Sequence, residues 1–269
     1  MSRPVGTLIE NGSGPWTTAG IRDCWLGGSH HNAADREIAE RILLGAPHLP
    51  HVVRVYRAFL GRVVRYLVRA GVRQFLDLGS GLPTASNVHE VAQDLSPGCR
   101  VMHVDIDPWV VAEGHNLLAG NHDAAMVRAD FRRPEQVLDA TRRCGLLDLG
   151  APVAVLAIDV LHHIPDTDDP VGFMASYLDA LCPGSHLSVA HSGHDESLVT
   201  GLRIFEDFYH IPVPPLTFRN LTQVARFFDS LDLVDPGIVP VPLWRAKLSG
   251  GAPVDPEGFP AYCGLGRKV

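Results

Sequence analysis

The sequence predicts an α/β protein built on a doubly wound, mainly parallel sheet. From residue 74 onward, short apolar runs alternate with amphipathic stretches, and the connections between them are short. Residues 153–158 are all apolar, as expected of a strand that is covered on both faces. With 269 residues, 46% of them hydrophobic, the chain can bury a sizeable core without disulfide staples.

Two amphipathic helices are expected before the first strand, at Asp35–Leu44 and Val52–Ala70. In each of them, apolar residues recur at every third or fourth position while charged residues mostly face away. Gly71 then supplies the C-cap of the second helix. Residues 1–20, which are rich in Gly, Pro, Ser and Thr, are expected to form a loose arm.

Strands and helices alternate after Gly71. The expected strands are Gln74–Leu78, Val101–Ile106, Ala125–Ala129, Val153–Ile158, His186–Ala190, Ile238–Leu243 and Ala261–Leu265. The expected helices are Asn87–Leu95, Pro108–Ala119, Val171–Leu181 and Val224–Ser230. A capping box formed by Asn220 and Gln223 precedes the last helix. The last two strands are candidates for an antiparallel pair.

Charge and cysteine content exclude several classes of protein. The net charge of −7 and the pI near 6.0 argue against binding to nucleic acid or to an anionic membrane. No apolar run approaches the length of a membrane span, and no signal peptide is expected at the N-terminus. The five cysteines are scattered and form no CxxC pair, which favours a reducing, cytoplasmic setting without disulfides.

A glycine turn follows the first expected strand, in the sequence Phe75–Gly81 (FLDLGSG). A strand that ends in an acid and a Gly-x-Gly turn lets backbone approach a nucleotide closely. The motif alone is weak, because a tight turn without a ligand can have the same sequence. Thr84 occupies the position of the third glycine in dinucleotide-binding folds, which points away from NAD.

Acidic residues also follow the next two strands. Asp105 is placed to accept hydrogen bonds from both hydroxyls of a bound ribose, while Asp107 could instead cap the helix that begins at Pro108. After the third strand, Asp130 could accept the exocyclic amine of an adenine, with Phe131 packed on its ring. Three such motifs at the ends of three successive strands are far less expected by chance than any one of them.

Taken together, DLGSG, VDIDP and RADF resemble the class I S-adenosylmethionine-dependent methyltransferases. Longer segments resemble one branch, the S-adenosyl methyltransferase family common in actinomycetes, formerly a domain of unknown function. These segments are Gly27–Gly28, Ala33–Glu37, Gln74–Asp77, Gly81–Thr84, Asn87–Ala92, Val160–Asp166, Arg226–Asp229 and Tyr262–Lys268. The resemblance implies a Rossmann-like sheet of seven strands and S-adenosylmethionine as cofactor. It also implies a helical N-terminal lid at 1–70 and a cofactor-binding domain at 71–269, which form one structural unit.

The resemblance also implies a set of site residues. Those expected to contact the cofactor are Asp77, Gly79, Gly81, Thr84, Asp105, Ile106, Asp130, Phe131, Asp159, Gly28 and Trp25. Trp25, in the lid, could make a cation–π contact with the sulfonium. Those expected to face the acceptor and act in catalysis are Asp159, His162 and His163. In this fold, inserts such as residues 193–218 commonly roof the acceptor pocket, and the apolar stripe Phe205, Phe208 and Tyr209 is either core or a selectivity element.

The 14 histidines offer catalytic groups rather than a metal site. No HExxH or similar ligand spacing occurs, so we expect no metal. His162 and His163 are candidates for a general base or for orienting the acceptor, because histidine titrates near neutrality. The alternative is that one packs against the sheet while the other caps a turn. His191 is a weaker candidate of the same kind.

One segment departs from the family pattern. Relatives usually read Tyr-Asp-Tyr-Leu-Leu-Gly-Gly-Lys-Asp-Asn-Phe where this chain has Arg22–Asn32, so both tyrosines, the lysine and the Asp-Asn pair are replaced. The leading expectation is a transferase that acts on a small molecule in specialised metabolism. The departures leave two alternatives open: an enzyme that uses S-adenosylmethionine without consuming it, or a catalytically silent subunit. A homo-oligomer or a pathway partner protein also stays open.

Overall fold

The computed structural model describes residues 16–84, 86–210, 215–246 and 259–269. The chain forms two compact units. Residues 1–55 and 195–215 make up the first, which we call the helical unit, and residues 56–194 and 216–269 make up the second, which we call the sheet unit. The lid expected at 1–70 and the cofactor-binding domain expected at 71–269 stay a prediction. The helix α3 (Leu49–Arg69) contributes residues to both units.

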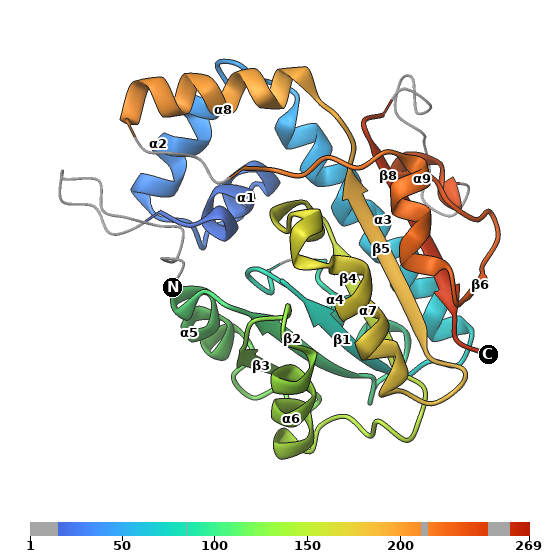
Figure 1. Ribbon diagram of the computed structural model, residues 1–269. Coiled ribbons are helices and arrows are strands. Elements are labelled where there is room, and N and C mark those ends of the chain that lie inside the picture. The colour runs from blue at the N-terminus through green and yellow to red at the C-terminus, as the bar shows by residue number, and fades with distance from the viewer. Residues whose placement is uncertain (1–15, 85, 211–214, 247–258) are drawn as a thin grey trace. The chain divides into compact units, whose positions relative to one another are not determined.

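The sheet unit is built on a mainly parallel sheet (Figure 1). Its strands are β1 (Gln74–Leu78), β2 (Arg100–Asp105), β3 (Ala124–Arg128), β4 (Ala154–Ile158), β5 (His186–Ser192), β6 (Asp232–Leu233), β7 (Val239–Pro240) and β8 (Ala261–Arg267). Seven of the eight strands found in the described residues follow the order β3-β2-β1-β4-β5-β8-β6, and β7 pairs with β8. The first five are parallel, whereas β8 runs antiparallel to β5, β6 and β7. The expected antiparallel pair is therefore confirmed.

The helices of this unit after α3 are α4 (Val88–Leu95), α5 (Pro108–Leu117), α6 (Pro134–Cys144), α7 (Pro170–Asp179) and α9 (Leu221–Ala225). Short 3-10 turns are η1 (Leu161–His163), η2 (Asp166–Asp168), η3 (Arg226–Phe228) and η4 (Val241–Leu243). Apolar residues of α6 and α7 pack on one face of the sheet, against Leu76, Leu78 and Val155. Because side chains alternate along a strand, Phe75 and Asp77 face the other side, where α4 lies.

The expected elements are mostly confirmed, with shifts of a few residues at their ends. Gly71 has a φ of +95°, and the amide of Val72 bonds back to the carbonyl of Leu67, which closes α3 as expected. The capping box of Asn220 and Gln223 is present, but it opens a helix that begins at Leu221 and continues as η3.

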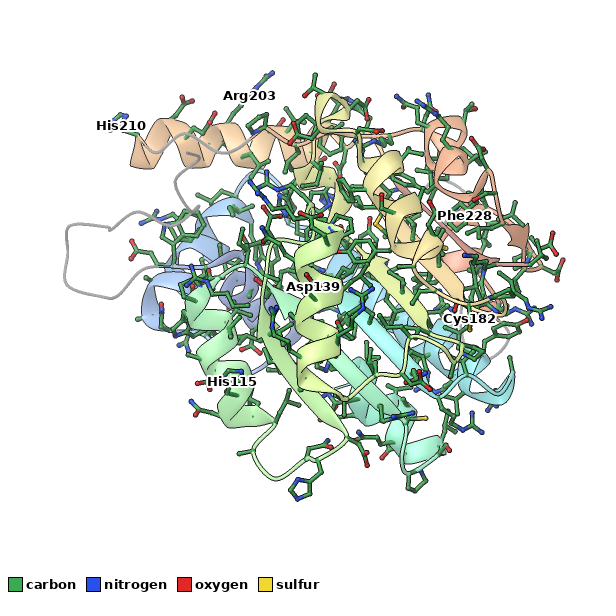
Figure 2. All side chains as sticks on the ribbon, turned by 60° about the horizontal axis from the view of Figure 1, so that its bottom comes forward. His115, Asp139, Cys182, Arg203, His210 and Phe228 are labelled. Atoms are coloured by element: carbon green, nitrogen blue, oxygen red, sulfur yellow. The ribbon has the colours of Figure 1, made fainter. Side chains whose placement is uncertain are left out.

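Three elements of the sheet unit differ from the sequence-based expectation. α6 was not expected; its buried residues are few, and Asp139 on its exposed side pairs with Arg142 at 2.8 Å (Figure 2). β6 is too short, at two residues, to leave a sequence signal. The strand expected at 238–243 is only β7, at 239–240. It is short because Pro240 and Pro242 lack the amide hydrogens that a longer ladder needs.

The helical unit contains α1 (Thr18–Leu26), α2 (Ala33–Ile42), the start of α3, and α8 (Glu196–Tyr209). The loose arm expected at residues 1–20 is wrong for its last three residues, which begin α1; residues 1–15 lie outside the described residues. Thr17 caps this helix by accepting a hydrogen bond from the amide of Gly20 at 2.9 Å, and Gly27 ends it in a left-handed conformation. Nine residues without a strong apolar period gave no helical signal.

α8 packs against α2 through glycines. A Cβ on Gly201 would lie 2.9 Å from the carbonyl oxygen of Ile42, and one on Gly45 would lie 2.6 Å from the Cα of Gly201. The backbones approach this closely only because neither residue has a side chain. The expected helical spacing at 202–209 is confirmed, whereas the side chains of Phe205, Phe208 and Tyr209 lie outside what the structure describes. In the described ranges, no helix is both long and apolar enough to cross a membrane.

Candidate cofactor and acceptor site

The glycine turn lies at the carboxyl end of β1. Gly79 and Gly81 have φ values of +61° and +62°, a region that L side chains rarely adopt. A Cβ on Gly79 would lie 2.3 Å from a methyl carbon of Val160, which follows β4. The turn after β1 and the loop after β4 are thus in close contact. Thr84 is half-buried on the same loop, where its amide donates to the carbonyl of Leu82 at 2.8 Å.

Asp105 joins the ends of β1 and β2. One carboxylate oxygen accepts from the amide of Gly81 at 2.9 Å and the other from the amide of Asp107 at 3.0 Å. Burial raises the pKa of Asp105, and these two hydrogen bonds oppose the rise. Asp107 caps α5 by accepting from the amides of Trp109 and Val110, so the alternative given for that residue is confirmed.

Asp130 follows β3 and forms a bidentate pair with Arg132, at 2.6 to 3.0 Å. Burial raises the pKa of Asp130, but the hydrogen bonds from Arg132 outweigh it and leave the pKa below its ordinary value. Phe131 is buried in the core beside Phe173, with a distance of 5.9 Å between the ring centroids. Its carbonyl accepts from the hydroxyl of Tyr177 at 2.8 Å. The packing of Phe131 on an adenine stays a prediction.

The end of β4 carries a polar cluster. Asp159 has a φ of +54°, and its amide donates to the carbonyl of Ala190 at 2.8 Å. Oδ1 of Asp159 accepts from the hydroxyl of Ser192 at 3.2 Å, and this hydroxyl lies 3.0 Å from the hydroxyl of Tyr56. Nδ1 of His162 lies 3.3 Å from the same Oδ1, near enough to form an ion pair but without the alignment of a hydrogen bond. Such contacts often tighten when substrate binds.

The three candidate histidines differ in what their ring nitrogens can do. His163 is exposed and its ring lies 4.1 Å from that of His162, centroid to centroid. Nδ1 of His191 donates to the carbonyl of Ser192 at 2.9 Å, and Nε2 accepts from Arg219 at 2.5 Å. Burial lowers the pKa of His191 to about 4, so this ring is neutral at pH 7. With both nitrogens bonded, His191 cannot take a proton from an acceptor.

Arg219 organises the turn that carries His162, and no sequence pattern had singled it out. Only 3% of it is exposed. Its guanidinium donates to the carbonyls of Leu161 and Ile164, at 3.0 and 2.8 Å, and to Asp166 at 2.7 Å. These bonds fasten both sides of the turn. The residues joined here are too far apart in the chain to form a local motif.

Asp77 is not a loop residue. Its Oδ2 accepts from Nδ1 of His103 at 2.9 Å, inside the layer between the sheet and α4. The contact of Asp77 with the cofactor stays a prediction, and no local sequence pattern indicates its histidine partner. Neighbouring strands place the two residues side by side, because Asp77 and His103 are partners in the β1–β2 register.

Trp25 and Gly28 belong to the helical unit, and their approach to the cofactor stays a prediction. Both residues lie in Arg22–Asn32, the segment that departs from the family pattern, and this segment has defined hydrogen bonds. Oδ2 of the buried Asp23 accepts from the amide of His30 at 2.9 Å and from Nδ1 of His31 at 3.0 Å. A Cβ on Gly28 would overlap the carboxylate of Asp23, at 2.1 Å, so a glycine is required here. The residues that depart from the family pattern therefore form a hydrogen-bonded turn around Asp23.

The residues at the strand ends fit an adenosine with a cationic sulfur. Ile106 is 53% exposed directly after Asp105, which leaves an apolar surface beside a carboxylate, as an adenine and its ribose require. The missing Cβ of Gly79 leaves room for the side chain of Val160, so the loops after β1 and β4 come together here. Asp77 and Asp105 place carboxyl groups at this end of the sheet, whereas the charge of Asp130 is balanced by Arg132. Within the described ranges, no cluster of three or more His, Cys, Asp or Glu side chains could hold a metal ion.

Comparisons with known proteins show the family of the chain. A family model described as S-adenosyl methyltransferase matches residues 12–269. A DUF574 family protein from Streptomyces avermitilis is 34% identical; the match covers 94% of this chain and 98% of that one, with a TM-score of 0.83. A protein from Thermobifida fusca YX, proposed to be a methyltransferase, is 36% identical over 94% of each chain, with a TM-score of 0.81.

A more distant structure, the mitomycin 7-O-methyltransferase MmcR, is 18% identical over 92% of this chain and 62% of that one, with a TM-score of 0.52. It shows likeness of fold alone. The search of curated proteins gave no match. The family match spans nearly the whole chain. The chain belongs to the S-adenosyl methyltransferase family and is a Rossmann-like, methyltransferase-type enzyme with S-adenosylmethionine as its cofactor.

Proposed function

We propose that the protein transfers a methyl group from S-adenosylmethionine to a small-molecule acceptor, in the specialised metabolism of the cytoplasm. The observation that carries the proposal is the pair formed by Asp159 and His162 at the carboxyl end of β4. β4 neighbours β1 in the sheet, and Val160 contacts the glycine turn. A base in this position would be next to the strand ends that we propose to hold the cofactor.

S-adenosylmethionine, when bound, supplies a methyl group on a positively charged sulfur. Asp105 would accept from the ribose, Ile106 would cover the adenine, and Asp130 would accept from the adenine amine. Asp77, Gly79, Gly81, Thr84 and Phe131 complete the proposed contacts of the sheet unit. The helical unit, through Trp25 and Gly28, would close over the cofactor and exclude water.

His162 is the proposed general base. Its Nδ1 faces the carboxylate of Asp159, so Nε2 is the nitrogen left to take a proton from the acceptor. The carboxylate would stabilise the positive ring that results. Ser192 holds Asp159 in place, and His163, exposed beside His162, would orient the acceptor. General bases of this kind contribute about 10²–10⁴-fold to the rate.

The test follows the methyl group. The protein is incubated with deuterated-methyl S-adenosylmethionine and a small-molecule extract of an actinomycete, and mass spectrometry searches for a product that carries the label. We expect a labelled product, stoichiometric S-adenosylhomocysteine, and loss of both with His162→Gln. His122→Gln, a substitution at an exposed histidine, is the matched control and should behave as wild type.

Other outcomes would replace the proposal. A product that forms while S-adenosylmethionine stays intact would mean that the cofactor is not consumed. Activity that appears only in a partner protein, and only when this protein and the cofactor are present, would mean a supporting subunit. An unchanged yield with His162→Gln would remove the base from the mechanism.

A further inference from the structure

Three polar side chains are linked in a row inside the sheet unit. Oδ2 of Asp77 lies 2.9 Å from Nδ1 of His103, and Nε2 of His103 lies 3.2 Å from Nδ1 of His89. The residues come from β1, β2 and α4. All three are buried, and the side chain of His103 is completely so. These three elements lie next to the glycine turn. β1 leads into it, α4 follows it, and Asp105 at the end of β2 accepts from the amide of Gly81.

The fold alone does not require these three polar side chains. On the other side of Asp77 in the sheet, the register partner is Leu156, which is fully buried. An apolar pair could fill the positions of Asp77 and His103 in the same way. Burying a carboxylate and two imidazoles costs free energy even when they are paired, and apolar replacements of similar volume are often neutral or stabilising.

The proton positions follow from the partners. The carboxylate of Asp77 can only accept, so Nδ1 of His103 donates to it. Burial, and then the neighbouring His103, lower the pKa of His89 to about 4, which leaves His89 neutral at pH 7. When both rings are neutral, Nδ1–H of His89 donates to Nε2 of His103. Each ring then fixes the tautomer and orientation of the next, and the last donor fixes the carboxylate.

Asp77 keeps one oxygen for another partner. Oδ1 makes no hydrogen bond to any described residue, yet it is not among the atoms that are buried without a partner. It therefore retains access to the surface, although only 5% of the side chain is exposed. An almost buried carboxylate with one open oxygen, two residues before Gly79, is arranged to meet a cationic group.

We infer that His103 and His89 are positioning residues for S-adenosylmethionine, which hold the carboxylate of Asp77 so that Oδ1 faces a positively charged group of the cofactor. The inference concerns cofactor binding and needs no acceptor. Its outcome is therefore independent of whether, and to what, a methyl group is transferred.

Calorimetric titration with S-adenosylmethionine tests the inference with paired variants. His103→Leu removes the donor to Asp77, whereas His103→Asn keeps one, because the amide nitrogen of Asn can replace Nδ1–H. We expect the Leu variant to bind about tenfold more weakly than wild type, and the Asn variant to bind within about threefold. His89→Leu and His89→Asn should show the same order with a smaller difference. His122→Asn, an exposed control, should leave affinity unchanged.

Each result decides the question. All titrations are run well below the melting temperature of each variant, so that lost stability does not imitate lost affinity. If folded His103→Leu binds S-adenosylmethionine as tightly as wild type does, the two histidines are only structural and the inference is overturned. If His103→Leu does not fold, the His89 pair decides by the same criterion. In ¹⁵N NMR of the wild type, Nδ1 of His103 should be protonated and its signal should move when the cofactor binds; an unmoved signal also overturns the inference.

Discussion

Replacing Arg219 should be among the most damaging single changes in the sheet unit. In Arg219→Gln the turn that carries His162 loses the donors to the carbonyls of Leu161 and Ile164, and His191 loses the donor to its Nε2. Each buried acceptor left without a partner costs about 1–3 kcal/mol. The bond to Asp166 adds little, because that side chain is 64% exposed.

Three such losses should lower the free energy of unfolding by about 3–5 kcal/mol, because the amide of Gln replaces part of the lost hydrogen bonding. The assay is urea unfolding followed by circular dichroism, with the midpoint and slope compared to wild type. Arg226→Gln, which changes an exposed arginine a few residues away, is the control and should stay within about 0.5 kcal/mol. An Arg219→Gln protein within 1 kcal/mol of wild type would refute the view that this guanidinium fastens the turn.

Three further predictions concern pH, the cofactor and the helical unit. Burial lowers the pKa values of His89, His186 and His191 to about 4, so between pH 6.5 and 4 the unfolded chain binds protons that the folded chain does not. Stability should therefore be greatest above pH 6.5 and fall toward pH 4, by about 1–3 kcal/mol for each ring; equal urea midpoints at pH 7.5 and 5 would contradict this. Wild type should bind S-adenosylmethionine with micromolar affinity, about −8 kcal/mol, and Asp105→Ala should weaken it markedly in calorimetry; unchanged affinity would show that this carboxylate does not hold the ribose. Limited proteolysis should cut within residues 12–28 of the free protein and be slowed by the cofactor, and equal rates would count against a lid.

Local patterns predicted the parts of the fold that depend on local chemistry. β1 is buried along its whole length and was expected at its observed bounds. α6 was missed because most of its surface is polar and its apolar contacts come from few residues. α1 was missed because its stability depends on a cap at each end and on packing against α2, neither of which a short apolar period reveals.

The same division holds for the site. Asp77, Asp105 and Asp130 could be found because each lies at or just after the end of a recognisable strand. Arg219, Ser192 and Tyr56 could not be found, because long-range pairing brings them to the strand ends. The hydroxyls of Tyr56 and Ser192, 3.0 Å apart, are separated by 136 residues in the chain. Tyr56 lies on α3 and Ser192 on β5, so only the folded structure brings the two residues together.

The packing of α8 on α2 has a consequence for how the chain is made. Ile38 and Ile42 of α2 are buried in a cluster that also contacts Leu198 of α8, a residue synthesised long after them. At ribosomal speeds, the interval is on the order of ten seconds. During that time the apolar face of α2 has no α8 to cover it, so the nascent helical unit stays incomplete while the parallel strands are being added. A fragment that ends before residue 196 would keep that exposed face permanently, and we expect it to aggregate or to recruit chaperones where the full chain does not.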